Sequence, residues 1–126
     1  MCYAYPVTTN FPKDLVAASA TPIVLAILRQ GESYGYAIIK QVRDVSDERL
    51  AWTDGMLYPV LHRLEAAEFV SSHWQLGETG RRRKYYRLTP KGEEELERLV
   101  EQWTVVHSAL QRLTEPKGSG DDDVRP

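Results

Sequence analysis

The sequence has little of several features that define large classes of protein. Its 126 residues hold a single cysteine, Cys2, so no intramolecular disulfide can form, which agrees with a reducing compartment. The longest unbroken apolar run, Ile23 to Leu28, is far shorter than the roughly 20 residues that span a bilayer. Residues 1–10 lack the charged and then apolar layout of a signal peptide. We therefore expect a cytoplasmic protein that makes no use of a membrane.

Residue patterns typical of catalysis are also missing. The three histidines, His62, His73 and His107, have no mutual spacing that suggests a metal cluster. No nucleophile has a base at a motif spacing, and no glycine-rich phosphate loop is present. We expect no cofactor, no metal and no enzymatic activity.

The charge is unevenly distributed along the chain. A net charge of -2 argues against a protein that coats nucleic acid through bulk positive charge. Residues 121–126 carry three aspartates and one arginine, so this short end accounts for the whole net charge. Between residues 81 and 91 there are cations and no acid, namely Arg81, Arg82, Arg83, Lys84, Arg87 and Lys91. An acidic segment, residues 93–101, follows directly, so the positive charge is concentrated in one short stretch.

Apolar periodicity predicts helices before and after the middle of the chain. Residues 12–30 predict a first helix, in which Pro22 should cause a kink or a break near residues 18–21. Ser33 is placed to cap a second helix from Tyr34 to about Val45. Its apolar stripe is Ile38, Val42 and Val45. Thr53 is a good N-cap for a third helix, which has its buried stripe at Leu57, Val60, Leu61 and Leu64.

Short strands and a basic hairpin are expected around the third helix. Residues 50–52 can pair as a short strand, and residues 69–75 and 83–89 alternate well enough to form a hairpin. Gly77 and Gly80 fall between these two strands and suit a flexible tip. The basic cluster is therefore predicted to project from the domain on a hairpin.

The last predicted helix, residues 89–114, begins at Thr89 and Pro90. Its apolar residues recur at steps of three and four, which is the spacing of a heptad seam. They are Leu96, Leu99, Trp103, Val106, Leu110 and Leu113. We expect this seam to join two copies of the chain, and we expect residues 115–126 to form a disordered acidic tail.

The order of elements predicts an α+β, mostly α, winged helix-turn-helix fold over residues 12–92, including the first helix. Residues 1–11 would be an N-terminal arm, and the last helix would be a dimerisation helix. The candidate DNA-reading residues are Tyr58, His62 and Arg63 on the third helix. The candidate phosphate contacts are the wing residues Arg81, Arg82, Arg83 and Lys84. Packing of Tyr58, or pairing of Arg63 with Asp54 or Glu65, is the alternative at the third helix.

Trp103 lies in the middle of the heptad seam and has two possible roles. It can pack as part of a dimer core, or it can flank a cavity in which a flat ligand stacks. The residue type alone favours the core.

Three strings of the sequence resemble the PadR family of bacterial transcriptional regulators. They are Ser33-Tyr34-Gly35-Tyr36, then Gly55-Met56-Leu57-Tyr58-Pro59 on the third helix, and Gly80 to Thr89 at the wing. The similarity covers about residues 12–113, and the single helix after the wing is similar to the short subfamily.

The resemblance implies a homodimeric repressor whose last helix crosses to the other subunit. It also implies that Trp103 stacks on flat drugs in a pore walled by Leu15, Ala18, Pro22, Ala26 and His107. Two residues depart from the family pattern. Glu68 stands where glycine is usual, which implies roughly 1 kcal/mol of strain in a left-handed backbone, and His107 stands where a carboxylate is found in drug-binding relatives.

The expected function is that of a ligand-responsive repressor. Its partners would be a double-stranded, pseudo-palindromic DNA operator, a second copy of the chain and a flat aromatic small molecule. The alternative is a winged-helix module that binds a partner protein through Tyr58, His62 and Trp74 without reading DNA sequence.

Overall fold

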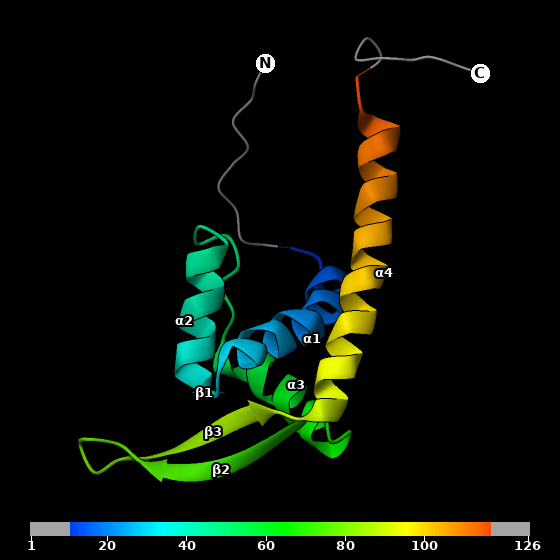
Figure 1. Ribbon diagram of the computed structural model, residues 1–126. Helices are drawn as coiled ribbons and strands as arrows, with labels where there is room; N and C mark the ends of the chain where they lie inside the picture. Colours follow the sequence, from blue (N-terminus) through cyan, green and yellow to red (C-terminus); the bar gives the residue numbers. More distant parts are fainter. Residues whose placement is uncertain (1–10, 117–126) are drawn as a thin grey trace. The chain divides into compact units, whose positions relative to one another are not determined.

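The computed structural model describes residues 11–116, and it has the mostly helical α+β architecture that the sequence predicts (Figure 1). Most of the predicted arm and tail, residues 1–10 and 117–126, lies outside the described residues. The described chain divides into two compact units, residues 11–96 and 97–116. None of the described helices combines the length and apolarity needed to cross a bilayer. The elements are α1 (Lys13–Gln30), β1 (Ser33–Tyr34), α2 (Gly35–Val45), α3 (Asp54–Ala66), β2 (Val70–Leu76), β3 (Arg82–Leu88) and α4 (Pro90–Thr114).

The core of the first unit lies between the buried faces of its helices and the sheet. The predicted stripe of α3 is buried, as are Ile38 and Val42 of α2 and Val24 and Leu25 of α1. Each such aliphatic side chain contributes about 1.5–3 kcal/mol when fully buried. The Oγ1 atom of Thr53 accepts a hydrogen bond from the backbone N–H of Met56 at 3.3 Å, which confirms the predicted N-cap of α3.

Pro22 does not break the first helix, which runs without interruption through residues 13–30. Proline removes one backbone hydrogen bond from a helix interior. In α1, the residues on both sides of Pro22, including Ala20 and Val24, are buried. We attribute the continuity of the helix to this burial, which offsets the lost bond. The prediction of a break was wrong for this reason.

The third strand of the sheet is β1, and not residues 50–52 as expected. Ser33 pairs with Tyr86 and Tyr34 pairs with Tyr85, so Ser33 enters the sheet and does not cap α2. Residues 50–52 form no strand, and the side chain of Trp52 is buried in the core. Val45 is 70% exposed, so the buried stripe of α2 ends at Val42.

Strands β2 and β3 form the predicted wing, an antiparallel hairpin in register from Val70–Leu88 to Leu76–Arg82. With β1 on the other side of β3, the sheet order is β1-β3-β2. At the tip, the N–H of Gly77 donates to the carbonyl of Arg81 at 2.7 Å, and Gly80 has a φ of +83°, which favours glycine. Figure 1 shows this tip extending away from the helices of the first unit.

Glu68, between α3 and β2, has a left-handed backbone with a φ of +67°. Its carbonyl oxygen accepts a hydrogen bond of 2.7 Å from the Oγ1 atom of Thr89, which also accepts one from the N–H of Gly92 in the first turn of α4. These bonds join the root of the wing to α4 and hold the strained residue in place. The departure from glycine noted in the sequence therefore falls on a residue that adopts the strained conformation.

Replacing Glu68 by glycine is expected to raise the free energy of unfolding by about 1 kcal/mol, because glycine has no steric penalty at positive φ. Urea denaturation followed by circular dichroism measures this change. Glu68→Ala is the matched control, since alanine removes the same side chain but keeps the penalty. If both variants gained equal stability, the side chain of Glu68 and not its backbone would be the source of strain.

Candidate nucleic-acid interface

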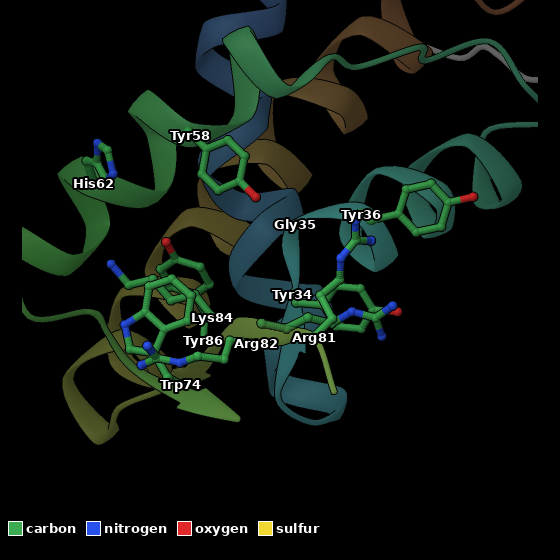
Figure 2. A pocket seen from close by; sticks show the side chains of 11 residues that line it. Tyr34, Gly35, Tyr36, Tyr58, His62, Trp74, Arg81, Arg82, Lys84 and Tyr86 are labelled. Atoms are coloured by element: carbon green, nitrogen blue, oxygen red, sulfur yellow. The ribbon is translucent and has the colours of Figure 1, made fainter. Parts of the chain in front are cut away.

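The start of α2, one face of α3 and the wing together line a hollow of about 550 Å³ in the first unit (Figure 2). None of the residues that line the hollow is acidic. Four of them are the cations predicted to contact phosphate, and two are the candidate readers Tyr58 and His62. The lining residues are Tyr34, Gly35, Tyr36, Tyr58, His62, Trp74, Arg81, Arg82, Arg83, Lys84 and Tyr86.

Aromatic rings hold three of the wing cations. The guanidinium carbon of Arg82 lies 4.9 Å from the ring centre of Trp74, and that of Arg83 lies 4.5 Å from the ring centre of Tyr34. A guanidinium that stacks on a ring keeps its N–H donors free at its edge. The rings therefore orient these two arginines without neutralising their charge.

Lys84 differs from the arginines because it has an acidic neighbour. Its Nζ atom lies 4.0 Å from Oε1 of Glu65 and 5.7 Å from the ring centre of Tyr86. The other carboxylate oxygen of Glu65 accepts a hydrogen bond of 2.6 Å from the hydroxyl of Ser72. Glu65 thus fixes Lys84 at the edge of α3, while the arginines make no ion pair within residues 11–116.

Tyr58 and His62 lie one turn apart on α3, and Figure 2 shows both side chains on the side of the hollow. Tyr58 is 36% exposed, so its ring is partly packed but its hydroxyl remains within reach of a ligand. Beneath them lies Tyr86, which is only 1% exposed. Burial raises the pKa of the Tyr86 hydroxyl, with smaller contributions from Glu65 and Tyr58, so this phenol stays neutral and adds no negative charge to the hollow.

Arg63 lies on a different face of α3 from the other candidate readers. It lines an apolar groove between α1 and α3, because one residue along a helix rotates the side chain by about 100°. The structure therefore does not bring Arg63 together with His62 at the hollow, and it does not pair with Asp54 or Glu65. The groove is lined by Phe11, Lys13, Val16, Ala17, Met56, Pro59, Val60 and Arg63.

The six cations of residues 81–91 are divided between two sides of the wing. Arg87 lies 3.6 Å from Oε1 of Glu32, which also lies 3.4 Å from Nε2 of His73. Gln75 donates a hydrogen bond of 2.9 Å to the other carboxylate oxygen of Glu32. Lys91 lies near the ring of Phe69, at 5.5 Å from its centre. Only the four predicted phosphate contacts reach the hollow.

Sequence reasoning did not place Tyr34, Tyr36 or Trp74 at this interface. Trp74 was considered only for a protein partner, yet it pairs with Lys84 in the hairpin and is 56% exposed. Because side chains alternate along strands, this register puts Trp74 on the same face as Arg82 and Lys84. The spacing of two between the hairpin residues was therefore a usable indication of the role of Trp74.

Within the second unit, the predicted seam is largely solvent-exposed on α4. Val106, Leu110 and Leu113 are exposed, with Leu113 at 83%, and Trp103 is exposed at 36%. Leu99 is half-buried. Leu96 differs from the rest, because it belongs to the first unit and is fully buried there, so it is a core residue of the single chain and has no surface for a second copy.

The candidate ligand residues of α1 share one side of that helix at steps of three and four. Leu15 and Ala18 are exposed, and Pro22 and Ala26 are half-buried. His107 on α4 is exposed. Within residues 11–116 no group of three histidine, cysteine, aspartate or glutamate side chains is arranged to hold a metal ion.

A family model decides what kind of protein carries this interface. The model of the transcriptional regulator PadR-like family matches residues 24–98, which include α2, α3 and the whole wing. The chain belongs to the PadR-like family. This confirms the resemblance seen in the sequence, and it makes the protein a DNA-binding transcriptional regulator and not an enzyme.

Solved structures of PadR-like and other transcriptional regulators are similar to this chain. One regulator from Clostridium thermocellum is 31% identical with a TM-score of 0.74, and the match covers 82% of this chain and 100% of that one. A PadR family regulator from Eggerthella lenta is 32% identical with a TM-score of 0.69, covering 82% and 88%. Uncharacterized protein X of Lysinibacillus sphaericus is 28% identical over 102 residues, 81% of this chain and 94% of its own. The PadR-like winged-helix fold is therefore shared over most of the chain.

Proposed function

We propose that this PadR-like regulator is a homodimeric repressor that binds a pseudo-palindromic operator through paired α3 helices and wings. One observation carries the proposal: the hollow gathers Tyr58, His62 and four wing cations on one side of the domain, without an acid among its lining residues. A duplex offers that surface base edges for the helix and phosphates for the cations. The two kinds of contact are therefore available to one DNA ligand at the same time.

The wing supplies affinity, while α3 supplies sequence reading. Four cations that each replace a counterion give log K a slope of roughly -3.6 against log salt for each wing. Tyr58 and His62 lie where a helix in the major groove presents hydrogen-bonding groups. Arg63 is no longer a candidate for the same contact, because it faces the groove beside α1.

Dimerisation follows from the exposed seam of α4. Trp103, Val106, Leu110 and Leu113 leave an apolar stripe on the surface of one chain, and a second copy can cover it. Two DNA-binding units joined in this way would read half-sites spaced by about 34–36 Å, one turn of the duplex.

Footprinting of the purified protein on the DNA upstream of its own gene tests this proposal. We expect protection of two half-sites separated by one helical turn, and an affinity that falls by orders of magnitude between low and moderate salt. A scrambled duplex of the same length is the control for sequence reading. Weak salt dependence, together with no protected DNA, would instead support the module that binds a protein partner.

A flat aromatic ligand that binds at Trp103 would release the repressor from DNA. Release requires that the ligand binds the DNA-free arrangement of the dimer more tightly than the DNA-bound one. The support is that Trp103 lies in the seam and keeps 36% of its surface exposed, so its indole is not fully used by packing within the chain.

Trp103→Ala is expected to weaken binding of a flat aromatic dye by roughly tenfold or more, because a stacked aromatic pair contributes about 0.5–1.5 kcal/mol beyond the area it buries. Dye fluorescence measures the affinity, and release of the footprinted DNA measures the response. His107→Ala, one turn away, tests whether the imidazole contributes. Unchanged dye affinity and unchanged release in Trp103→Ala would show that Trp103 is only a packing residue.

A further inference from the structure

Gly35, the first residue of α2, is buried directly beneath the side chain of Tyr58 from α3. A β-carbon built at position 35 would lie 2.9 Å from Cζ of Tyr58 and closer still to its hydroxyl oxygen. The tyrosine hydroxyl therefore occupies the space that any side chain at position 35 would need. Figure 2 shows the hydroxyl of Tyr58 directed toward Gly35.

We propose that Gly35 is a positioning residue for DNA binding, which holds the hydroxyl of Tyr58 where it donates a hydrogen bond to a backbone phosphate. This inference rests on the proposed contact between Tyr58 and DNA. Within residues 11–116 the Tyr58 hydroxyl makes no hydrogen bond, so its donor is free for a ligand. The acid-free lining of the hollow and its four cations favour an anion at that place.

The first turn of α2 adds to the same preference. Its N-cap residue, Tyr34, provides no side-chain hydrogen bond, and the turn contains no acidic residue. The first backbone N–H groups of a helix lack partners inside the helix and carry its partial positive charge. Because Gly35 has no side chain, the Tyr58 hydroxyl can lie against this turn and can act together with it on one phosphate oxygen.

A methyl group at position 35 should displace Tyr58 and leave the fold intact. The atoms it would meet are the far end of a side chain that is 36% exposed, so the ring can rotate toward solvent. Alanine also favours helix more than glycine does. The cost of Gly35→Ala should therefore fall on DNA binding and not on stability.

The experiment compares four proteins: the natural chain, Gly35→Ala, Tyr58→Ala and the double variant. Fluorescence anisotropy measures binding to two labelled duplexes of about 30 base pairs, long enough for two half-sites, one from the footprinted region and one of random sequence. We expect each single variant to bind both duplexes roughly tenfold more weakly, the effect of losing one hydrogen bond to a charged group. The double variant should bind as Tyr58→Ala does, because the methyl group then fills the space vacated by the ring.

Stability is compared with a second alanine substitution at the start of a helix. Gly55→Ala adds a methyl group in the first turn of α3, where a β-carbon would meet only the Oγ1 atom of Thr53 at 3.9 Å. Both alanine variants should melt at or slightly above the temperature of the natural chain. A Gly35→Ala protein that fails to fold would overturn the proposal, because the glycine would then serve the backbone and not Tyr58.

The other outcomes separate this inference from the proposed function. If Tyr58→Ala binds DNA normally, the proposed contact of Tyr58 fails and the role of Gly35 fails with it. If Tyr58→Ala weakens binding but Gly35→Ala does not, or if the two losses are additive, Gly35 has no positioning role and the proposed function stands. A loss confined to the footprinted duplex would overturn the phosphate contact, since a phosphate contact does not depend on base sequence.

Discussion

Replacing Arg81, Arg82 and Arg83 together by glutamine is expected to nearly abolish DNA binding at moderate salt. Each cation that neutralises a phosphate contributes roughly 0.9 to the slope of log K against log salt, so the slope should fall by about 2.7 for each wing. All three arginines line the hollow, and none makes an ion pair within the described residues. Their loss therefore removes contacts to DNA without breaking contacts inside the protein.

Anisotropy titrations of the footprinted duplex at several salt concentrations measure the affinity and the slope together. The matched control is Arg29→Gln with Arg43→Gln and Arg49→Gln, which removes the same charge from exposed residues outside the hollow. Lys84 is left in place because its contact with Glu65 would confuse the comparison. Equal losses of slope in the two triple variants would show that net charge, and not the wing, determines binding.

Val106→Asp combined with Leu110→Asp is expected to convert the protein to a monomer and to lower its operator affinity by about 100-fold or more. Both residues are exposed on α4 and belong to the predicted seam. A dimer places its second DNA-binding unit beside the second half-site, and that linkage contributes about 10²- to 10⁴-fold in affinity. Charged side chains across the seam would repel each other and remain in water as monomers.

Sedimentation velocity measures the oligomeric state, and anisotropy measures the operator affinity. Thr104→Asp combined with Gln111→Asp is the control, because it adds the same two charges at exposed positions of α4 outside the seam. The seam is wrongly assigned if the seam variant remains dimeric, or if both variants dissociate equally.

Elements whose pattern is local could be predicted from the sequence. The cap at Thr53 and the buried stripe of α3 depend on residues within four positions of each other, and both predictions are confirmed. The wing was equally accessible, because two alternating segments enclose Gly77 and Gly80. The basic cluster was therefore placed on the correct hairpin, beside the correct helix.

Predictions failed where a distant contact competes with a local preference. Ser33 is a good helix cap by composition, but pairing of β1 with Tyr86 and Tyr85 uses it as a strand residue. Leu96 continues a heptad spacing, yet it completes the core of the first unit. In both cases the alternative depends on a partner far away in the sequence, which periodicity does not reveal.

The sequence by itself determined that this chain has a capped third helix, a glycine-tipped basic hairpin and a long final helix with an apolar stripe. Only the tertiary structure decided which side chains meet. It turned Arg63 away from the hollow, directed Arg87 to Glu32, and placed the Tyr58 hydroxyl over Gly35. The physical reason is that local pattern fixes the type of an element through backbone propensity and amphipathicity. The rotation of one helix against another is fixed by close packing between distant residues, where the space of a single β-carbon changes the result.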